Sequence, residues 1–109
     1  FDKAMISLLR KERMLSKKAE LGLIHNDDKV IIYSVGSLCF AFNFHPEKSF
    51  SDYPIPTKLI GDYRAILSSD ESRFGGFDRA DMQYNYFTFQ YGFNCYLPSR
   101  TVTVFKKMK

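Results

Sequence analysis

The clearest hydrophobic pattern of the chain is a strict alternation that ends just before a proline. Its large apolar residues, found at every second position, are Leu38, Phe40, Phe42 and Phe44. Because alternate side chains of a strand share one face, we predict a central strand whose large side chains enter one core. The other face carries small residues, which either admit a second layer or lie near solvent: Cys39, Ala41 and Asn43. Pro46 ends the strand, because proline lacks the N–H that a sheet requires.

The first residues of the chain show a helical period instead. In residues 1–14, apolar side chains recur at i, i+4, i+7 and i+8, which predicts an amphipathic helix. They are Phe1, Met5, Leu8 and Leu9. Ser16 is placed to cap a second short helical turn that Gly22 would close. We expect these helices to pack on the chain's own sheet or on a missing neighbour. An exposed stripe could also pair two isolated chains in a homodimer without biological meaning.

Turn-forming residues divide the rest of the chain into short strands. Beside the central one, the predicted strands are residues 29–34, 63–67, 93–97 and 100–106. Within the second of these, Tyr63, Ala65 and Leu67 are expected to share one face. Val102 and Val104 are expected to face together in the last. Six or seven short antiparallel strands at this spacing predict a mainly β fold, a two-sheet Greek-key β-sandwich.

Proline and glycine residues indicate the structure of the remaining segments. Pro54 and Pro56 forbid a central strand in the extended passage around them and suit an edge. Residues 68–76 form a long loop whose two adjacent glycines, Gly75 and Gly76, allow backbone conformations closed to other residues. Residues 79–92 predict one short strand or a hairpin, and their register stays open.

Composition and charge exclude several classes of function. Of the 109 residues, 45% are hydrophobic and 17% aromatic, which is too apolar for a disordered chain. The net charge of +4 comes from the predicted helices and the C-terminal lysines, while the strand-rich body between them is mildly acidic. We therefore expect no nucleic-acid partner, which would need a basic groove with interleaved aromatic residues. No apolar run approaches the roughly 18 residues of a membrane span, and no secretory signal is visible. We expect a cytoplasmic protein with no membrane partner.

Cysteine, histidine and acidic residues are present, but their spacing does not match a catalytic or metal-binding motif. Cys39 and Cys95 lack metal-ligand spacing and are predicted to be buried thiols. His25 and His45 stand alone, so capping or surface roles are expected of them. The carboxylates, Asp70 among them, all fall in turns or loops where solvated side chains are the rule. We predict no catalytic, cofactor-binding or metal-binding residue, and no cofactor.

Three motifs nevertheless resemble a known family. The motifs are FNFHPEKSFSDY at 42–53, ILSSDESRFGG at 66–76 followed by Arg79, and LPSRTVTVF at 97–105. In order and spacing they are similar to the C-terminal part of 1,4-α-glucan (glycogen or starch) branching enzymes of the α-amylase superfamily. FDKAM at 1–5 is similar to the helical segment after the catalytic barrel of that family. The chain departs from the family pattern at 33–35 and at Phe77, where a histidine is usual.

The resemblance implies a fragment of an enzyme that lacks the catalytic residues, and the chain begins at Phe1 rather than Met. The parent would cleave an α-1,4 linkage and transfer the freed chain to a 6-hydroxyl. Residues 1–26 would join the catalytic barrel to a β-sandwich at 27–109. The expected partners are that barrel, in the same polypeptide, and the α-glucan polymer.

The aromatic content leaves a second function open, a stand-alone carbohydrate-binding module. Aromatic planes stack on sugar faces, although tryptophan is absent here. For either function, the candidate residues for a weak glucan contact are Tyr53, Phe74 and Phe77.

Overall fold

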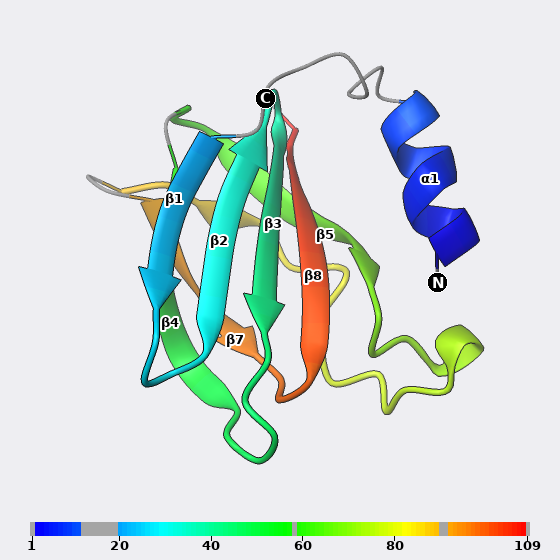
Figure 1. Cartoon of the computed structure of the whole chain (residues 1–109). Coiled ribbons are helices and arrows are strands. Elements are labelled where there is room, and N and C mark those ends of the chain that lie inside the picture. The colour runs from blue at the N-terminus through cyan, green and yellow to red at the C-terminus, as the bar shows by residue number, and fades with distance from the viewer. Residues whose placement is uncertain (1, 12–19, 58, 90–91, 109) are drawn as a thin grey trace.

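The computed structural model describes residues 2–11, 20–57, 59–89 and 92–108 of the chain, which form one helix, one 3-10 turn and eight strands. In chain order these elements are α1 (Asp2–Lys11), β1 (Glu20–His25), β2 (Val30–Val35), β3 (Leu38–Asn43), β4 (Phe50–Pro56), β5 (Asp62–Ser68), η1 (Ser72–Phe74), β6 (Tyr86–Phe87), β7 (Gly92–Leu97) and β8 (Thr101–Lys107) (Figure 1).

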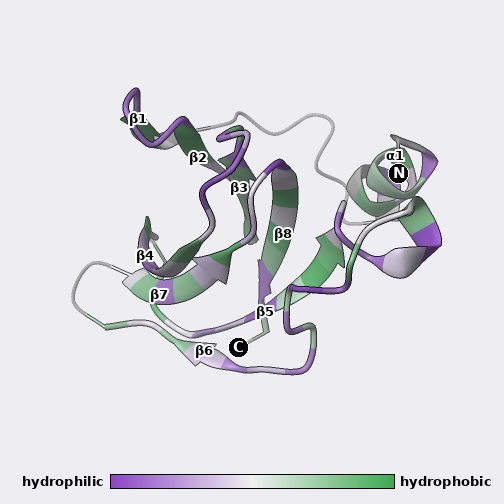
Figure 2. Cartoon of the chain, turned by 90° about the horizontal axis from the view of Figure 1, so that it is seen from below, coloured by the Kyte–Doolittle hydropathy of each residue, from purple (hydrophilic) through white to green (hydrophobic). Residues whose placement is uncertain are grey.

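The strands form two antiparallel sheets. One has six strands in the order β1-β2-β3-β8-β5-β6, and the other consists of β4 and β7. Seen end-on, the larger sheet curls around the smaller one, and α1 lies on the opposite, outer side (Figure 2). The chain crosses between the sheets, so that β3 pairs with the distant β8. The predicted antiparallel sandwich of Greek-key type is confirmed.

Both faces of β3 are buried, each in a different hydrophobic cluster. Its small residues Cys39 and Ala41 lie in the core between the sheets, which confirms that this face admits a second layer. Burial raises the pKa of the Cys39 thiol to about 12 and also raises the pKa of Cys95, as expected for inert buried thiols. The complete cluster between the sheets comprises Val30, Ile32, Cys39, Ala41, Tyr53, Ile55, Tyr63, Ala65, Phe93, Cys95, Leu97 and Phe105.

The large residues of β3 face outward instead, into a second cluster. Leu38 and Phe40 are buried there, and Phe42 is partly buried against it. The prediction is wrong for Phe44, whose side chain is 56% exposed because the strand ends at Asn43. We call this second set of residues the outer cluster; its buried members are Val35, Leu38, Phe40, Leu67 and Val104.

The helix covers part of the outer cluster. Met5 and Leu8 of α1 pack against it together with Ala4, which confirms the predicted amphipathic helix at these positions. Phe1, the side chain of Leu9 and residues 12–19, including the predicted cap Ser16, lie outside the described residues. The helical turn predicted to end at Gly22 is wrong: Glu20–His25 is an edge strand of the larger sheet.

A bulge divides β5 between the two clusters. Its register with β8 shifts between Ala65 and Leu67, so Tyr63 and Ala65 enter the inter-sheet core whereas Leu67 turns into the outer cluster. The prediction that all three share a face is therefore wrong. A bulge inserts one residue on one strand, and each later side chain then changes face.

Prolines and a glycine determine the structure of the smaller sheet. β4, which contains Pro54 and Pro56, pairs with β7 alone, as predicted for an edge strand. At the start of β7, a side chain on Gly92 would overlap the backbone carbonyl of Ile55, so only glycine fits. Within residues 79–92, the open register is settled for β6, where Tyr86 pairs with Tyr63.

We expect truncation of Phe40 to Ala to lower the free energy of unfolding by about 3–5 kcal/mol, because a buried ring leaves a cavity in the outer cluster. Phe87→Ala is the matched control: Phe87 is an exposed ring of β6, and its truncation should change stability by at most about 0.5 kcal/mol. Urea unfolding followed by circular dichroism measures both, and equal midpoints for the two variants would contradict the assignment of the outer cluster.

Candidate functional site

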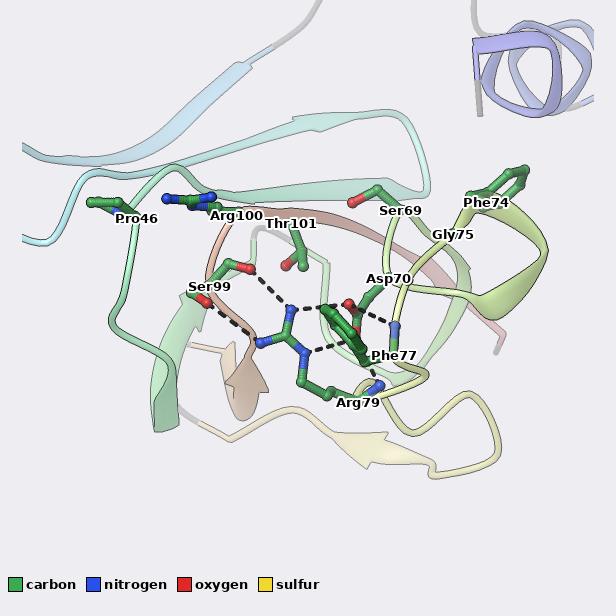
Figure 3. Close-up of a pocket in the computed structure, with 11 residues that line it drawn as sticks. Pro46, Ser69, Asp70, Phe74, Gly75, Phe77, Arg79, Ser99, Arg100 and Thr101 are labelled. Atoms are coloured by element: carbon green, nitrogen blue, oxygen red, sulfur yellow. Dashed lines mark hydrogen bonds and ion pairs between the residues drawn. The ribbon is translucent and has the colours of Figure 1, made fainter.

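A groove of about 450 Å³ opens at one end of the sandwich, between the loop after β5 and the corner that joins β7 to β8 (Figure 3). Its floor is polar, and it is also lined by the exposed ring of Phe77 and the partly buried ring of Phe74. The lining residues are Pro46, Ser69, Asp70, Phe74, Gly75, Gly76, Phe77, Arg79, Ser99, Arg100 and Thr101.

At the floor of the groove, Asp70 and Arg79 form a two-pronged ion pair. Arg79 Nε donates to Asp70 Oδ2 and Nη2 donates to Oδ1, both at 3.0 Å. The backbone N–H of Arg79 also donates to Oδ2, at 2.7 Å, and that of Phe77 donates to Oδ1, at 3.3 Å. The Asp70 side chain is 2% exposed, and each of its carboxylate oxygens accepts two hydrogen bonds. Such saturation is what a buried charge requires.

Local backbone geometry places Asp70 where Arg79 can reach it. The Ser68 hydroxyl accepts a hydrogen bond from the Asp70 N–H (3.1 Å), while the Asp70 carbonyl accepts one from the Asp78 N–H (2.7 Å). Gly75 has φ of 86°, a left-handed conformation that favours glycine. A side chain on Gly76 would overlap the Asp70 backbone, so the second glycine is required by close approach.

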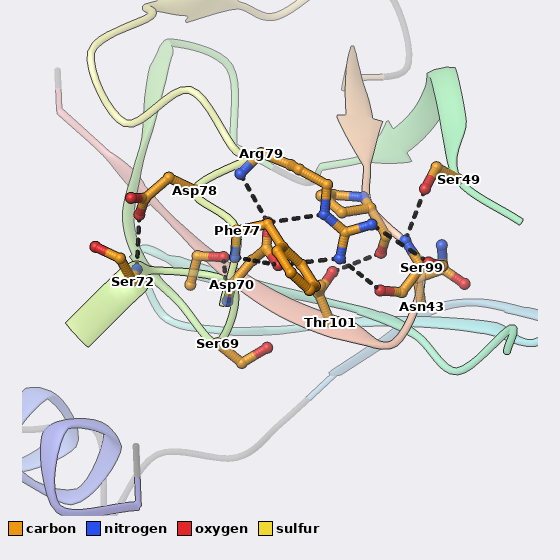
Figure 4. A network of polar contacts seen from close by, with 12 residues as sticks. Asn43, Ser49, Ser69, Asp70, Ser72, Phe77, Asp78, Arg79, Ser99 and Thr101 are labelled. Atoms are coloured by element: carbon orange, nitrogen blue, oxygen red, sulfur yellow. Dashed lines mark hydrogen bonds and ion pairs between the residues drawn. The ribbon is translucent and has the colours of Figure 1, made fainter. Parts of the chain in front are cut away.

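The same arginine ties the loop to the corner on the other side of the groove. Arg79 Nη2 donates to the Ser99 carbonyl at 3.2 Å, and Nη1 lies 3.4 Å from the Ser99 hydroxyl (Figure 4). The Ser99 N–H in turn donates to the Ser49 hydroxyl at 2.9 Å. The guanidinium therefore joins the loop after β5 to the corner at Ser99, and Ser99 in turn is bonded to the segment of Ser49.

The ion pair sets the protonation of both partners. Burial alone would raise the pKa of Asp70, but the hydrogen bonds from Arg79 and from the Phe77 N–H, together with the charge of Arg79, outweigh it and leave the pKa below its ordinary value. The hydrogen bond to Asp70 raises the pKa of Arg79 further. Asp70 is therefore an anion at neutral pH and has no proton to give in acid catalysis.

The structure brings together two of the three predicted glucan-contact residues. Phe74 and Phe77 both line the groove, and Phe77 is 78% exposed. Each ring has an arginine over it: Arg79 Cζ lies 5.4 Å from the Phe77 centroid, and Arg73 Cζ lies 4.6 Å from that of Phe74.

Tyr53 lies elsewhere, in the core between the sheets, where it is 7% exposed. Its hydroxyl donates to Asp28 Oδ2 at 3.2 Å; burial and this hydrogen bond raise the pKa of Tyr53 to about 12. A buried ring offers no face to a sugar.

The expectation of solvated carboxylates was wrong for Asp70, the residue on which the groove depends. A loop position is typical of exposure, and composition offered no sign of the partner nine residues later. The signal that could have identified this site is the motif at 66–79: its Asp70 and Arg79 form the ion pair, and its Gly76 allows the close approach to the Asp70 backbone. The histidines behave as expected: the Nδ1 of His25 accepts a hydrogen bond from the Asp28 N–H, and that of His45 accepts one from the Lys48 N–H.

Within the described residues, no group of three or more His, Cys, Asp or Glu side chains is placed to hold a metal ion. The described helix is not long and apolar enough to cross a membrane.

Comparison with known proteins adds the following. A family model described as the alpha amylase C-terminal all-beta domain matches residues 23–108. The chain is 40% identical over 99% of its length to a 1,4-alpha-glucan-branching enzyme of Dictyostelium discoideum, and 35% identical over 95% of its length to one of Saccharomyces cerevisiae. It is also 42% identical over 79% of its length to one of Rhizophagus irregularis. The chain spans only 13–17% of the length of these relatives.

We expect Asp70→Asn to destabilise the chain at pH 7 by on the order of 3 kcal/mol, because it leaves Arg79 without a counter-charge. The pH dependence should change as well. Since the pKa of Asp70 is lowered in the folded state, its stabilisation is complete above the unfolded value of about 3.9 and is lost as pH falls through the folded value.

Urea midpoints between pH 6 and pH 2.5 measure this effect. The wild type should lose stability on acidification, and Asp70→Asn should lose clearly less. Asp52→Asn, at an exposed carboxylate of β4, serves as the control and should follow the wild type. Parallel curves for the wild type and Asp70→Asn would contradict the role of the ion pair.

Proposed function

Because the chain belongs to the family of alpha-amylase C-terminal all-beta domains, we propose that it is the non-catalytic C-terminal domain of a 1,4-α-glucan branching enzyme. The observation that carries this proposal is the agreement among relatives: 35–42% identity over 79–99% of the chain to proteins that are each named 1,4-alpha-glucan-branching enzyme. Because those relatives are about six times longer, a part of a larger enzyme is favoured over a stand-alone binding module.

In the proposed parent, a glucan chain is cut at an α-1,4 linkage and transferred to a 6-hydroxyl, in the cytoplasm. The chemistry of the groove supports a non-catalytic role for this part. Glycoside chemistry needs two carboxyl groups that face each other, one of them able to give a proton. Asp70 is instead saturated by Arg79 and the backbone, with a lowered pKa.

The first task of the domain is to brace the catalytic barrel of the same polypeptide. Support comes from α1, which packs on the outer cluster through Ala4, Met5 and Leu8 while Ile6 remains about half exposed. A helix with apolar residues on two sides can contact the sandwich with one side and a neighbouring unit with the other. Its expected role is to join the barrel to the sandwich.

The second task is a weak contact with the glucan, for which Phe74 and Phe77 in the lining of the groove are the candidates. The flat ring of Phe77 is held over Arg79 and reaches solvent, so it can stack on the apolar face of a sugar with little loss of side-chain entropy.

The experiment that tests the proposed function is an iodine-stain assay on amylose. The full-length protein that contains this chain should shift the stain as α-1,6 branches form, whereas the 109-residue chain alone should leave it unchanged. A full-length protein without branching activity, or activity in the isolated chain, would contradict the proposal.

The packing of α1 on the outer cluster predicts that this helix contributes to the stability of the full-length protein. Leu8→Glu should lower the thermal unfolding temperature of the full-length protein, because it places a charge against the outer cluster. Ser7→Glu, at an exposed position of the same helix, should leave that temperature unchanged. Equal unfolding temperatures for the two variants would contradict a structural role for the contact.

A further inference from the structure

A second groove continues the first along the end of the sandwich. It has a volume of about 300 Å³ and is mostly apolar, with Phe42, Phe44 and Val102 among its walls. The two grooves share three lining residues, Ser69, Arg100 and Thr101. The two grooves are therefore adjacent at these residues.

We call the two together the combined groove, and each part has one exposed aromatic ring in its lining. Phe77 belongs to the first part and Phe44 to the second, and their exposed fractions are 78% and 56%. The alternation at residues 38–44 predicts Phe44 as a core residue and does not indicate a binding role for it. Its exposure results from the end of β3 one residue earlier.

Both rings are supported from behind. Phe44 stacks on Phe42 with centroids 5.5 Å apart and an interplanar angle of 16°, and Phe42 stacks in turn on Tyr33. Phe77 lies over the guanidinium of Arg79, which is itself fixed by Asp70 (Figure 3). Each ring therefore has one face occupied by the protein while much of the ring remains in solvent. Rings held in this way lose little entropy when a ligand stacks on them.

The lining residues that the two grooves share, Ser69, Arg100 and Thr101, are polar. The Ser69 hydroxyl accepts a hydrogen bond from the Val102 N–H at 2.9 Å and keeps its proton for donation. Arg100 is exposed and adds guanidinium donors at the junction of the two parts. The charge of Arg79 is already balanced by Asp70, so this arginine adds no net charge to the floor of the groove.

We propose that the two grooves form one extended site for a linear α-1,4-glucan segment, with Phe77 and Phe44 each stacking on a sugar ring and with Arg100 and Ser69 bonding hydroxyls between them. This inference rests on the proposed function, and it deepens it by placing two separated sugar contacts on the domain. A sugar presents an apolar C–H face and a polar edge, and the combined groove offers both kinds of surface in sequence.

The test uses the full-length protein and compares Phe44→Leu and Phe77→Leu with two control variants. Leucine keeps an apolar side chain but removes the flat ring. Phe87→Leu and Phe89→Leu are matched controls, since these rings are also exposed but lie on and after β6, outside both grooves. The probes are maltoheptaose and maltose, with dissociation constants from calorimetry, and retardation in native gels that contain glycogen.

Each groove variant should weaken maltoheptaose binding by roughly two- to tenfold, the double variant by more, and glycogen retardation should fall in parallel. Because Arg100 and Ser69 are proposed to bond sugar hydroxyls between the two stacked rings, the disaccharide maltose should lose less affinity in the double variant than maltoheptaose does. The controls should bind like the wild type. The catalytic site is common to all variants, so differences among them report on the grooves.

Two results would overturn the inference. One is maltoheptaose binding that is the same in the groove variants, the controls and the wild type. The other is a lower thermal unfolding temperature in the groove variants than in the controls, with unchanged glucan binding, which would mean that the parent polypeptide itself covers the rings. In both cases the wild type would still branch amylose, so the failure is distinguishable from that of the proposed function, where branching itself is absent.

Discussion

The ion pair of Asp70 and Arg79 is the interaction on which the groove depends. A buried carboxylate is costly unless its oxygens are satisfied, and here the bidentate guanidinium and two backbone N–H groups satisfy them. The same contacts fix three things at once: the path of the loop around η1, the attachment of that loop to Ser99, and the support beneath the Phe77 ring. Removal of either partner would therefore alter the shape of the groove as well as the stability of the domain.

The larger sheet buries apolar residues on both of its faces. Small side chains on the inner face of β3 leave room for rings from the second sheet, such as those of Tyr53 and Phe93. Large side chains on the outer face form the cluster that α1 partly covers. The aromatic stack on that outer face runs through Tyr33 and Phe42 and ends at the exposed Phe44, at the groove. The outer face thus serves both packing and, in our proposal, ligand contact.

Much of this architecture could be predicted from the sequence, but the direction of the faces could not. Alternation identified β3, and prolines identified the edge strand β4. Period-two patterns do not say which face meets the second sheet, and they fail at a bulge, which is why Leu67 was assigned to the wrong face. Local capping signals favour a helical turn before Gly22 over a strand in the short apolar run, whereas pairing with β2 makes Glu20–His25 a strand. In the groove, Phe74 and Phe77 could be predicted, but the burial of Asp70 and the exposure of Phe44 depend on contacts between distant segments.

Amide hydrogen exchange in Asp70→Asn tests most directly whether the ion pair holds the groove in shape. In the wild type, the N–H groups of Phe77, Asp78 and Arg79, which are bonded to Asp70, should exchange slowly for a loop. In Asp70→Asn these three amides should lose protection by at least an order of magnitude more than amides paired between β2 and β3, whose hydrogen bonds do not involve Asp70. Loss of protection spread equally over the loop and the β2–β3 pair, or none in the loop, would contradict the account.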